Sequence, residues 1–161
     1  MSLYRFLASD LPLKDVHNPN IELISLNEMF KRNLEVPEIL LRNNDIDMDE
    51  KIILVCESEE LLHELEIRKD NPEDHAADYT MKNFVSEVTF GYNHIRAEQL
   101  IRYIREHLLG SEEIELWCVW LGDVGDVEAE MKRQDDLTVE DIKRLFGATC
   151  FERPICLRVT K

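Results

Sequence analysis

Three aspartates at alternate positions, Asp45, Asp47 and Asp49, are spaced like the first ligands of a calcium-binding loop. A calcium loop of the EF-hand type needs glycine at its sixth position and a bidentate glutamate at its twelfth. This sequence has Glu50 and Cys56 at those positions, and Cys56 closes an apolar run. The pattern therefore predicts a solvated acidic turn that binds no metal.

A second acidic group surrounds a histidine and consists of Glu73, Asp74, His75 and Asp78. Carboxylates beside an imidazole can hold a metal ion or transfer protons. Pro72 and the polar residues around it predict a surface loop here. Because a tight site needs ligands that the scaffold holds in place, we expect neither a metal nor a cofactor to bind to this loop.

The four cysteines, Cys56, Cys118, Cys150 and Cys156, are the candidates for nucleophilic catalysis. A reactive cysteine needs a low thiol pKa and access to solvent, and Cys150, which follows an expected helix end, best meets the second condition. No base lies near it in the sequence, and no Gly-x-Ser-x-Gly, Walker A or Gly-x-Gly-x-x-Gly motif occurs. We therefore expect no catalytic residue. The cysteine spacing fits no metal site, and we expect four free thiols in a cytosolic protein.

One alternative is a ligand site at the segment 122–126, which contains two Gly-Asp pairs. It follows a predicted strand at its carboxyl end, where α/β proteins often bind ligands. Trp117 and Trp120 lie three apart on that strand and point to opposite faces, so one of them would be able to line a pocket there. The competing explanation is a polar turn beside two packed tryptophans. An enzyme or small-ligand-binding protein with a site assembled near this segment is therefore the alternative function.

Acidic residues dominate the chain. It has 34 Asp and Glu against 19 Lys and Arg, which gives a net charge of −15. Residues 45–78 hold 13 acids and 3 bases, and residues 112–141 hold 11 acids and 2 bases, so the remainder is positive by 4. These acids would repel the phosphates of a nucleic acid, so the composition argues against nucleic-acid binding.

Two explanations fit the clustered acids. Strong net charge keeps a protein soluble without any partner, and it also attracts a basic protein. A protein that imitates nucleic acid would have the same composition. Because no catalytic motif is present, we favour a small acidic cytosolic interaction or regulatory protein that binds a basic protein partner, such as an inhibitor, an immunity-type protein or an adaptor. The expected binding residues are Glu59, Glu60, Asp123 and Asp126.

The length of 161 residues and the hydrophobic content of 44% suit a single α+β domain over residues 1–161. The longest apolar run, residues 116–121, is far shorter than a membrane span. The first residues lack the features of a signal peptide, so we expect a cytoplasmic protein without membrane contact. The sequence indicates no oligomeric state.

A βαβ unit at residues 84–121 organises the predicted fold, which is a mixed sheet with helices packed on it. The hydrophobic period changes from that of a strand to that of a helix and back, which predicts a strand at 84–90, a helix at 94–109 and a strand at 114–121. Asn93 is the expected helix cap and Gly110 the expected stop. We expect Ile104, Leu116 and Val119 to be buried together.

The other elements are shorter. The sequence predicts strands at 3–8, 21–26, 51–57 and 155–160, and helical turns at 27–33 and 38–43. Met29 and Phe30 are expected to face inward. Residues 58–69 fit either a helix or a turn followed by a strand, and we favour the second because Ile67 falls off the helical face. A short helix is expected at 127–133, and a helix capped by Thr138 and Asp141 follows.

Overall fold

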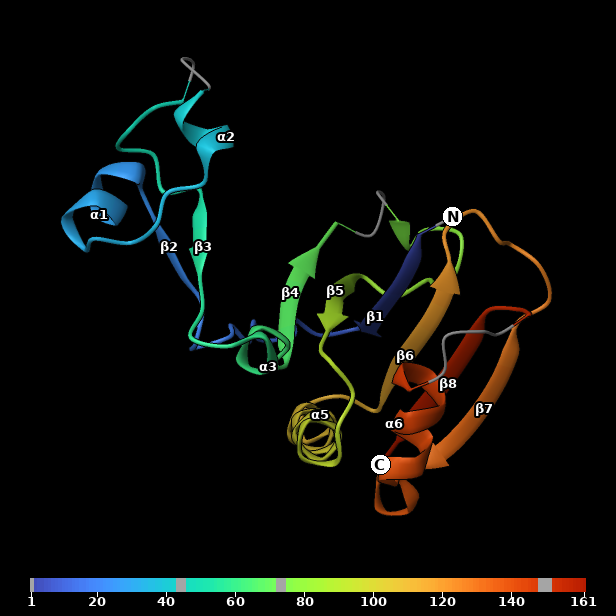
Figure 1. The fold of residues 1–161 in the computed structure, drawn as a ribbon. Coiled ribbons are helices and arrows are strands. Elements are labelled where there is room, and N and C mark those ends of the chain that lie inside the picture. The colour runs from blue at the N-terminus through green and yellow to red at the C-terminus, as the bar shows by residue number, and fades with distance from the viewer. Residues whose placement is uncertain (1, 43–45, 72–74, 148–151) are drawn as a thin grey trace. The chain divides into compact units, whose positions relative to one another are not determined.

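The computed structural model describes residues 2–42, 46–71, 75–147 and 152–161 (Figure 1). The chain divides into two compact units: a large unit of residues 1–17 and 63–161, and a small unit of residues 18–62. A single domain over residues 1–161 stays a prediction. The predicted α+β class, with a mixed sheet and helices packed on it, is confirmed. None of the helices in the described residues is long and apolar enough to cross a membrane.

The large unit is built on a six-stranded sheet of order β4-β5-β1-β6-β8-β7. Neighbouring strands run antiparallel, except that β7 and β8 run parallel. The strands are β1 (Leu3–Ser9), β4 (Glu66–Asp70), β5 (Phe84–Thr89), β6 (Glu113–Trp120), β7 (Glu128–Arg133) and β8 (Ile155–Thr160).

The predicted βαβ unit consists of β5, the helix α5 (His94–Leu108) and β6. Both strands pair antiparallel with β1, so they run parallel to each other with β1 between them. The side chain of Asn93 accepts a hydrogen bond from the backbone N–H of Arg96 at 2.8 Å, which confirms the predicted cap.

A second parallel connection joins β7 to β8 through a 3-10 turn (Gln134–Asp136) and the helix α6 (Val139–Phe146). Thr138 and Asp141 form the predicted capping box at the start of α6, and Gly147 is its C-cap. The local sequence therefore predicted where both helices begin.

The helices α5 and α6 lie on the same face of the six-stranded sheet (Figure 1). Ile104 of α5 and Leu116 of β6 are fully buried in the core beneath them. Val119 is also buried, but on the opposite face, beside Phe6 and Trp117. The prediction that Val119 shares a core with Ile104 is therefore wrong, because residues three apart on a strand point to opposite faces.

The small unit contains the two-stranded antiparallel sheet of β2 (Glu22–Ile24) and β3 (Ile53–Val55). The helices in the described part of this unit are α1 (Leu26–Lys31), α2 (Glu38–Leu41) and α3 (Glu59–Leu62). Ser25 and Glu28 form a capping box at the start of α1. The core of this unit is small, with Ile24, Leu26 and Met29 buried.

Two predictions about local structure are wrong. Residues 127–133 were expected to form a short helix, whereas β7 occupies them. Glu, Ala, Met, Lys and Arg favour helices, but parallel pairing with β8 overrides that preference. Met29 and Phe30 were both expected to face inward; Met29 is buried as predicted, whereas the ring of Phe30 is exposed.

The segment 58–69, which fitted either a helix or a turn followed by a strand, forms the favoured turn and strand. One helical turn, α3, precedes β4, and Ile67 of β4 pairs with Val88 of β5. The strand predicted at 51–57 is present as β3, but it is shorter and only half-buried, because the sheet it joins has a single partner strand.

Candidate functional site

The predicted binding acids lie in two places. Glu59 and Glu60 are exposed in the first turn of α3, which belongs to the small unit. Asp123 and Asp126 lie in the connection between β6 and β7, which belongs to the large unit. Each pair is therefore held by a different unit, and the convergence of the two pairs on one surface stays a prediction.

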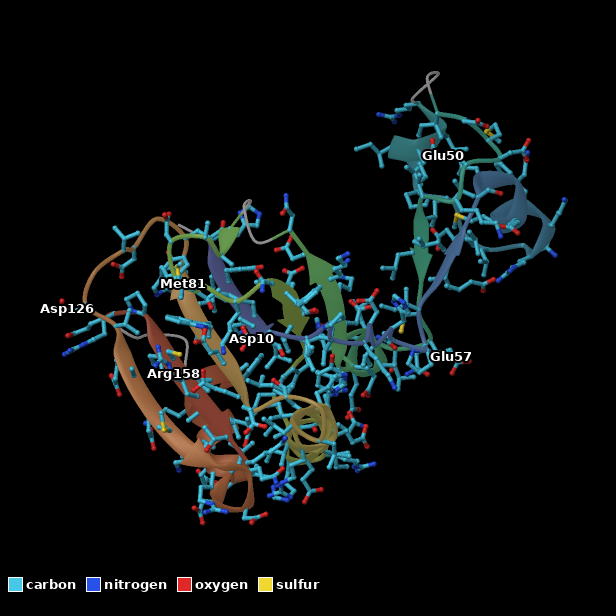
Figure 2. All side chains as sticks on the ribbon, turned by 180° about the vertical axis from the view of Figure 1, so that it is seen from behind. Asp10, Glu50, Glu57, Met81, Asp126 and Arg158 are labelled. Carbon is cyan, nitrogen blue, oxygen red and sulfur yellow. The ribbon has the colours of Figure 1, made fainter. Side chains whose placement is uncertain are left out.

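The connection after β6 is a polar turn. Gly122 has a φ of +88°, a backbone conformation that strongly favours glycine, and the carboxylate of Asp123 accepts a hydrogen bond from the backbone N–H of Gly125 at 3.1 Å. Figure 2 shows Asp126 farther along the same connection. The glycines thus serve the turn itself, and both aspartates keep carboxylate oxygens for solvent or for a partner.

The small unit is strongly acidic. Its 45 residues contain 11 Asp and Glu against 4 Lys and Arg, a net charge of −7. Three of those bases already form ion pairs with acids of the same unit, which are Arg32 with Glu22, Arg42 with Glu38 and Lys51 with Glu28. The remaining charge of this unit is therefore almost entirely negative.

Local hydrogen bonds keep two of these acids ionised. The guanidinium of Arg32 contacts both carboxylate oxygens of Glu22 at 2.7 Å, and its hydrogen bonds lower the pKa of Glu22. The backbone N–H of Ser25 lowers the pKa of Glu28 in the same way, with a smaller contribution from Lys51. A carboxylate whose pKa is lowered stays charged well below neutral pH.

An apolar surface lies on the same unit. Leu23 of β2 pairs directly with Leu54 of β3, and their side chains are 51% and 48% exposed. The neighbouring strand residues Ile24, Ile53 and Val55 point the other way, into the small core. We refer to the exposed side as the Leu23–Leu54 face. Sequence reasoning missed it, because the apolar run of residues 52–56 predicts a strand that is buried on both sides.

A polar cluster lies on the face of the large sheet opposite α5 and α6. The carboxylate of Glu115, which is 5% exposed, accepts hydrogen bonds from Trp117 Nε1 at 2.8 Å and from Thr80 Oγ1 at 2.6 Å. Arg158 Nε lies 3.7 Å from its other oxygen. The buried carboxylate is thus held by neighbouring side chains, and the cluster fixes Thr80 and Trp117 against the sheet.

The two buried cysteines, Cys118 and Cys156, are poor nucleophiles. Burial and the nearby Glu115 carboxylate raise the pKa of Cys156 to about 12, and burial also raises the pKa of Cys118. Both thiols are therefore neutral at physiological pH, and the thiolate is the reactive form. Cys56, Cys118 and Cys156 carry no disulfide among the described residues, and Cys150 lies outside them.

Within the residues that the structure describes, no three His, Cys, Asp or Glu side chains are grouped to hold a metal. Asp47 accepts a hydrogen bond from the backbone N–H of Asp49, and Asp49 accepts one from the side chain of Asn27 at 2.8 Å. These contacts make a local turn. Asp45, Glu73 and Asp74, on which the two candidate metal groups also depend, lie outside the described residues.

The hollows described on the large unit lie away from residues 122–126. One of about 620 Å³ is lined by residues of β4, β5 and the loop after β1, including Pro12, Asp70 and Phe84. Beside the 122–126 connection, the hydroxyl of Tyr79 donates a hydrogen bond to the backbone carbonyl of Trp120 at 3.3 Å. A small-ligand site at this connection stays a prediction.

Comparison with known proteins gives no family. No protein-family model matches the chain, and searches of the curated proteins and of the solved structures find no match.

Proposed function

We propose that this protein is a small acidic interaction protein that binds a basic protein partner. The observation that carries the proposal is the net charge of −7 on the small unit, where ion pairs already engage Arg32, Arg42 and Lys51. The unit therefore keeps a strongly negative field that a basic surface would meet. The two expected contact pairs, Glu59 with Glu60 and Asp123 with Asp126, extend this acidic character to both units.

The physical role of such charge is to speed association. A surface of one sign raises the local concentration of an oppositely charged protein and increases its association rate. Salt weakens the attraction, because the Debye length falls to about 8 Å near physiological ionic strength. A partner recruited in this way therefore binds more slowly as the salt concentration rises.

We further propose that the protein acts in the reducing cytoplasm. The buried, neutral thiols of Cys118 and Cys156 support this, since free buried cysteine is common where disulfides do not form. An enzyme or small-ligand protein with a site near residues 122–126 is the alternative, and it becomes the leading one if the charge proves to serve solubility alone.

The test is partner recovery from native cell extract at low and at high salt. We expect a variant with Glu59, Glu60, Asp123 and Asp126 replaced by Lys to recover about tenfold less partner than the wild type at low salt, because each replacement turns attraction into repulsion. High salt should also lower the amount of partner that the wild type recovers.

The matched control reverses four exposed acids elsewhere on the large unit, which are Glu98, Glu106, Asp135 and Glu152. Both variants change the net charge equally, so the control separates the position of the acids from their number. Equal recovery by the wild type and the four-acid variant at both salt concentrations would contradict the proposed function and leave solubility as the role of the charge.

A further inference from the structure

The two-stranded sheet of the small unit has one covered side and one exposed side. Ile24, Ile53 and Val55 pack with Leu26 and Met29 of the core. Leu23 and Leu54, which alternate with them, sit directly opposite each other and are about half exposed, at 51% and 48%. Side chains of directly paired residues are close enough to form one continuous apolar patch. The sheet therefore presents leucine side chains to solvent on the Leu23–Leu54 face.

Exposed apolar residues are concentrated in this small unit. Fifteen large apolar side chains are exposed among the described residues, and eight of them lie within the 45 residues of the small unit. Isolated exposed apolar residues are ordinary on a protein surface, whereas clustered ones mark sites where another molecule binds. Of these eight, Leu23 and Leu54 are the two that β-sheet pairing holds side by side.

Acids flank the face along the chain. Glu50 precedes β3 and Glu57 follows it, both are exposed, and Figure 2 shows them beyond the two ends of that strand. The small unit has a net charge of −7. It would therefore attract a partner's Lys or Arg side chain when an apolar side chain of the same partner packs on the two leucines.

We propose that the Leu23–Leu54 face is the docking surface for a cationic amphipathic segment of a partner protein. The apolar side of that segment covers Leu23 and Leu54, and its Lys and Arg side chains lie beside Glu50 and Glu57. This inference rests on the proposed binding of a basic protein and assigns that binding a place. A second copy of this chain is disfavoured as the occupant, because each copy carries a net charge of −15 and the two would repel each other.

The experiment uses the full chain and a defined probe, a synthetic amphipathic helical peptide of leucine and lysine. Its affinity is measured by fluorescence anisotropy, beside a lysine-only peptide of equal charge. Replacing Leu23 and Leu54 together by Ser should weaken binding of the amphipathic peptide by about tenfold or more. The proposal makes these two leucines the central apolar contact, and a few central contacts carry most of the binding energy of an interface. The same variant should bind the lysine-only peptide as the wild type does.

The matched control replaces Ile39 and Leu41 by Ser. Both are exposed apolar residues of the same unit, but they lie on α2. We expect this control to bind the amphipathic peptide as tightly as the wild type. Amide chemical-shift changes in the wild-type protein provide a readout that needs no substitution, and they should be largest at the residues of β2 and β3.

Three results would overturn the inference. The first is an equal affinity of the leucine variant and the α2 control, and the second is a set of shift changes centred outside β2 and β3. The third is a lysine-only peptide that binds the wild type as tightly as the amphipathic one. If the Lys replacements at Glu59, Glu60, Asp123 and Asp126 weaken peptide binding and the leucine replacements do not, the docking surface is wrong and the proposed function stands.

Discussion

Replacing Ile104 by Ala should lower the free energy of unfolding by about 2–5 kcal/mol, the usual cost of truncating a fully buried aliphatic side chain. Ile104 has no exposed surface and lies in the core between α5 and the sheet, where Leu100, Leu108 and Leu116 are also fully buried. The substitution leaves a cavity that the surrounding side chains fill only in part. Urea unfolding followed by circular dichroism measures the change.

The same helix provides a matched control. Ile95 is the second residue of α5 and is 67% exposed. Replacing Ile95 by Ala should change the free energy of unfolding by less than about 0.5 kcal/mol, as surface substitutions usually do. If the Ile104 and Ile95 variants had the same unfolding midpoint, that result would contradict the packing of α5 in the core.

Replacing Arg96 by Leu should destabilise the large unit by about 3 kcal/mol, because it removes one partner of a largely buried ion pair. Arg96 Nη2 donates to Glu64 Oε1 at 2.8 Å, and Arg96 Nη1 donates to the backbone carbonyl of Gly91 at 3.1 Å. The pair joins the start of α5 to the residues just before β4. Its loss leaves the carboxylate of Glu64 and the carbonyl of Gly91 without these donors.

The destabilisation should depend on pH in a known direction. The hydrogen bond from Arg96 lowers the pKa of Glu64, so the ion pair stabilises the fold at every pH above the ordinary range for glutamate. That contribution is lost as the pH falls through the lowered pKa of Glu64. The difference in free energy of unfolding between the wild type and the Arg96→Leu variant should therefore narrow in acid.

Arg102 is the control for this prediction, since it lies on the exposed side of the same helix. Replacing Arg102 by Leu should change stability little at any pH. Replacing Glu64 and Arg96 together by Leu should restore part of the lost stability, because no buried charge is then left without its partner. If the difference in free energy of unfolding between the wild type and the Arg96 variant stayed constant as the pH fell, that result would contradict the ion pair of Arg96 with Glu64.

The sequence predicted the elements that helix caps and a regular apolar stripe mark. The apolar stripe and the Asn93 cap located α5, and the capping box of Thr138 and Asp141 located α6. The prediction of a helix at 127–133 was wrong because a distant strand decides the structure there. Its residues favour a helix by themselves, and β7 forms only because β8, more than twenty residues later, provides a parallel partner.

The candidate site was predictable only in part. Acidic clustering is visible in the sequence and suggests a cationic partner for residues such as Glu59 and Asp123. The Leu23–Leu54 face was not visible, because the apolar run around Leu54 predicts a buried strand. Only the pairing in a sheet of two strands shows that one of its faces is exposed. The link from Arg96 to Glu64 was also missed, since the two residues lie 32 positions apart.

The most direct test of the central claim is the association rate constant of the partner recovered in the pull-down, measured by stopped-flow fluorescence at increasing salt concentration. We predict a rate constant that falls steadily with salt while the dissociation rate constant changes little, because long-range attraction acts mainly on the encounter. In the variant with Lys at residues 59, 60, 123 and 126, the association rate constant should be low and much less sensitive to salt. An association rate constant of the wild type that is independent of salt would contradict the claim that its acidic surface recruits a basic protein.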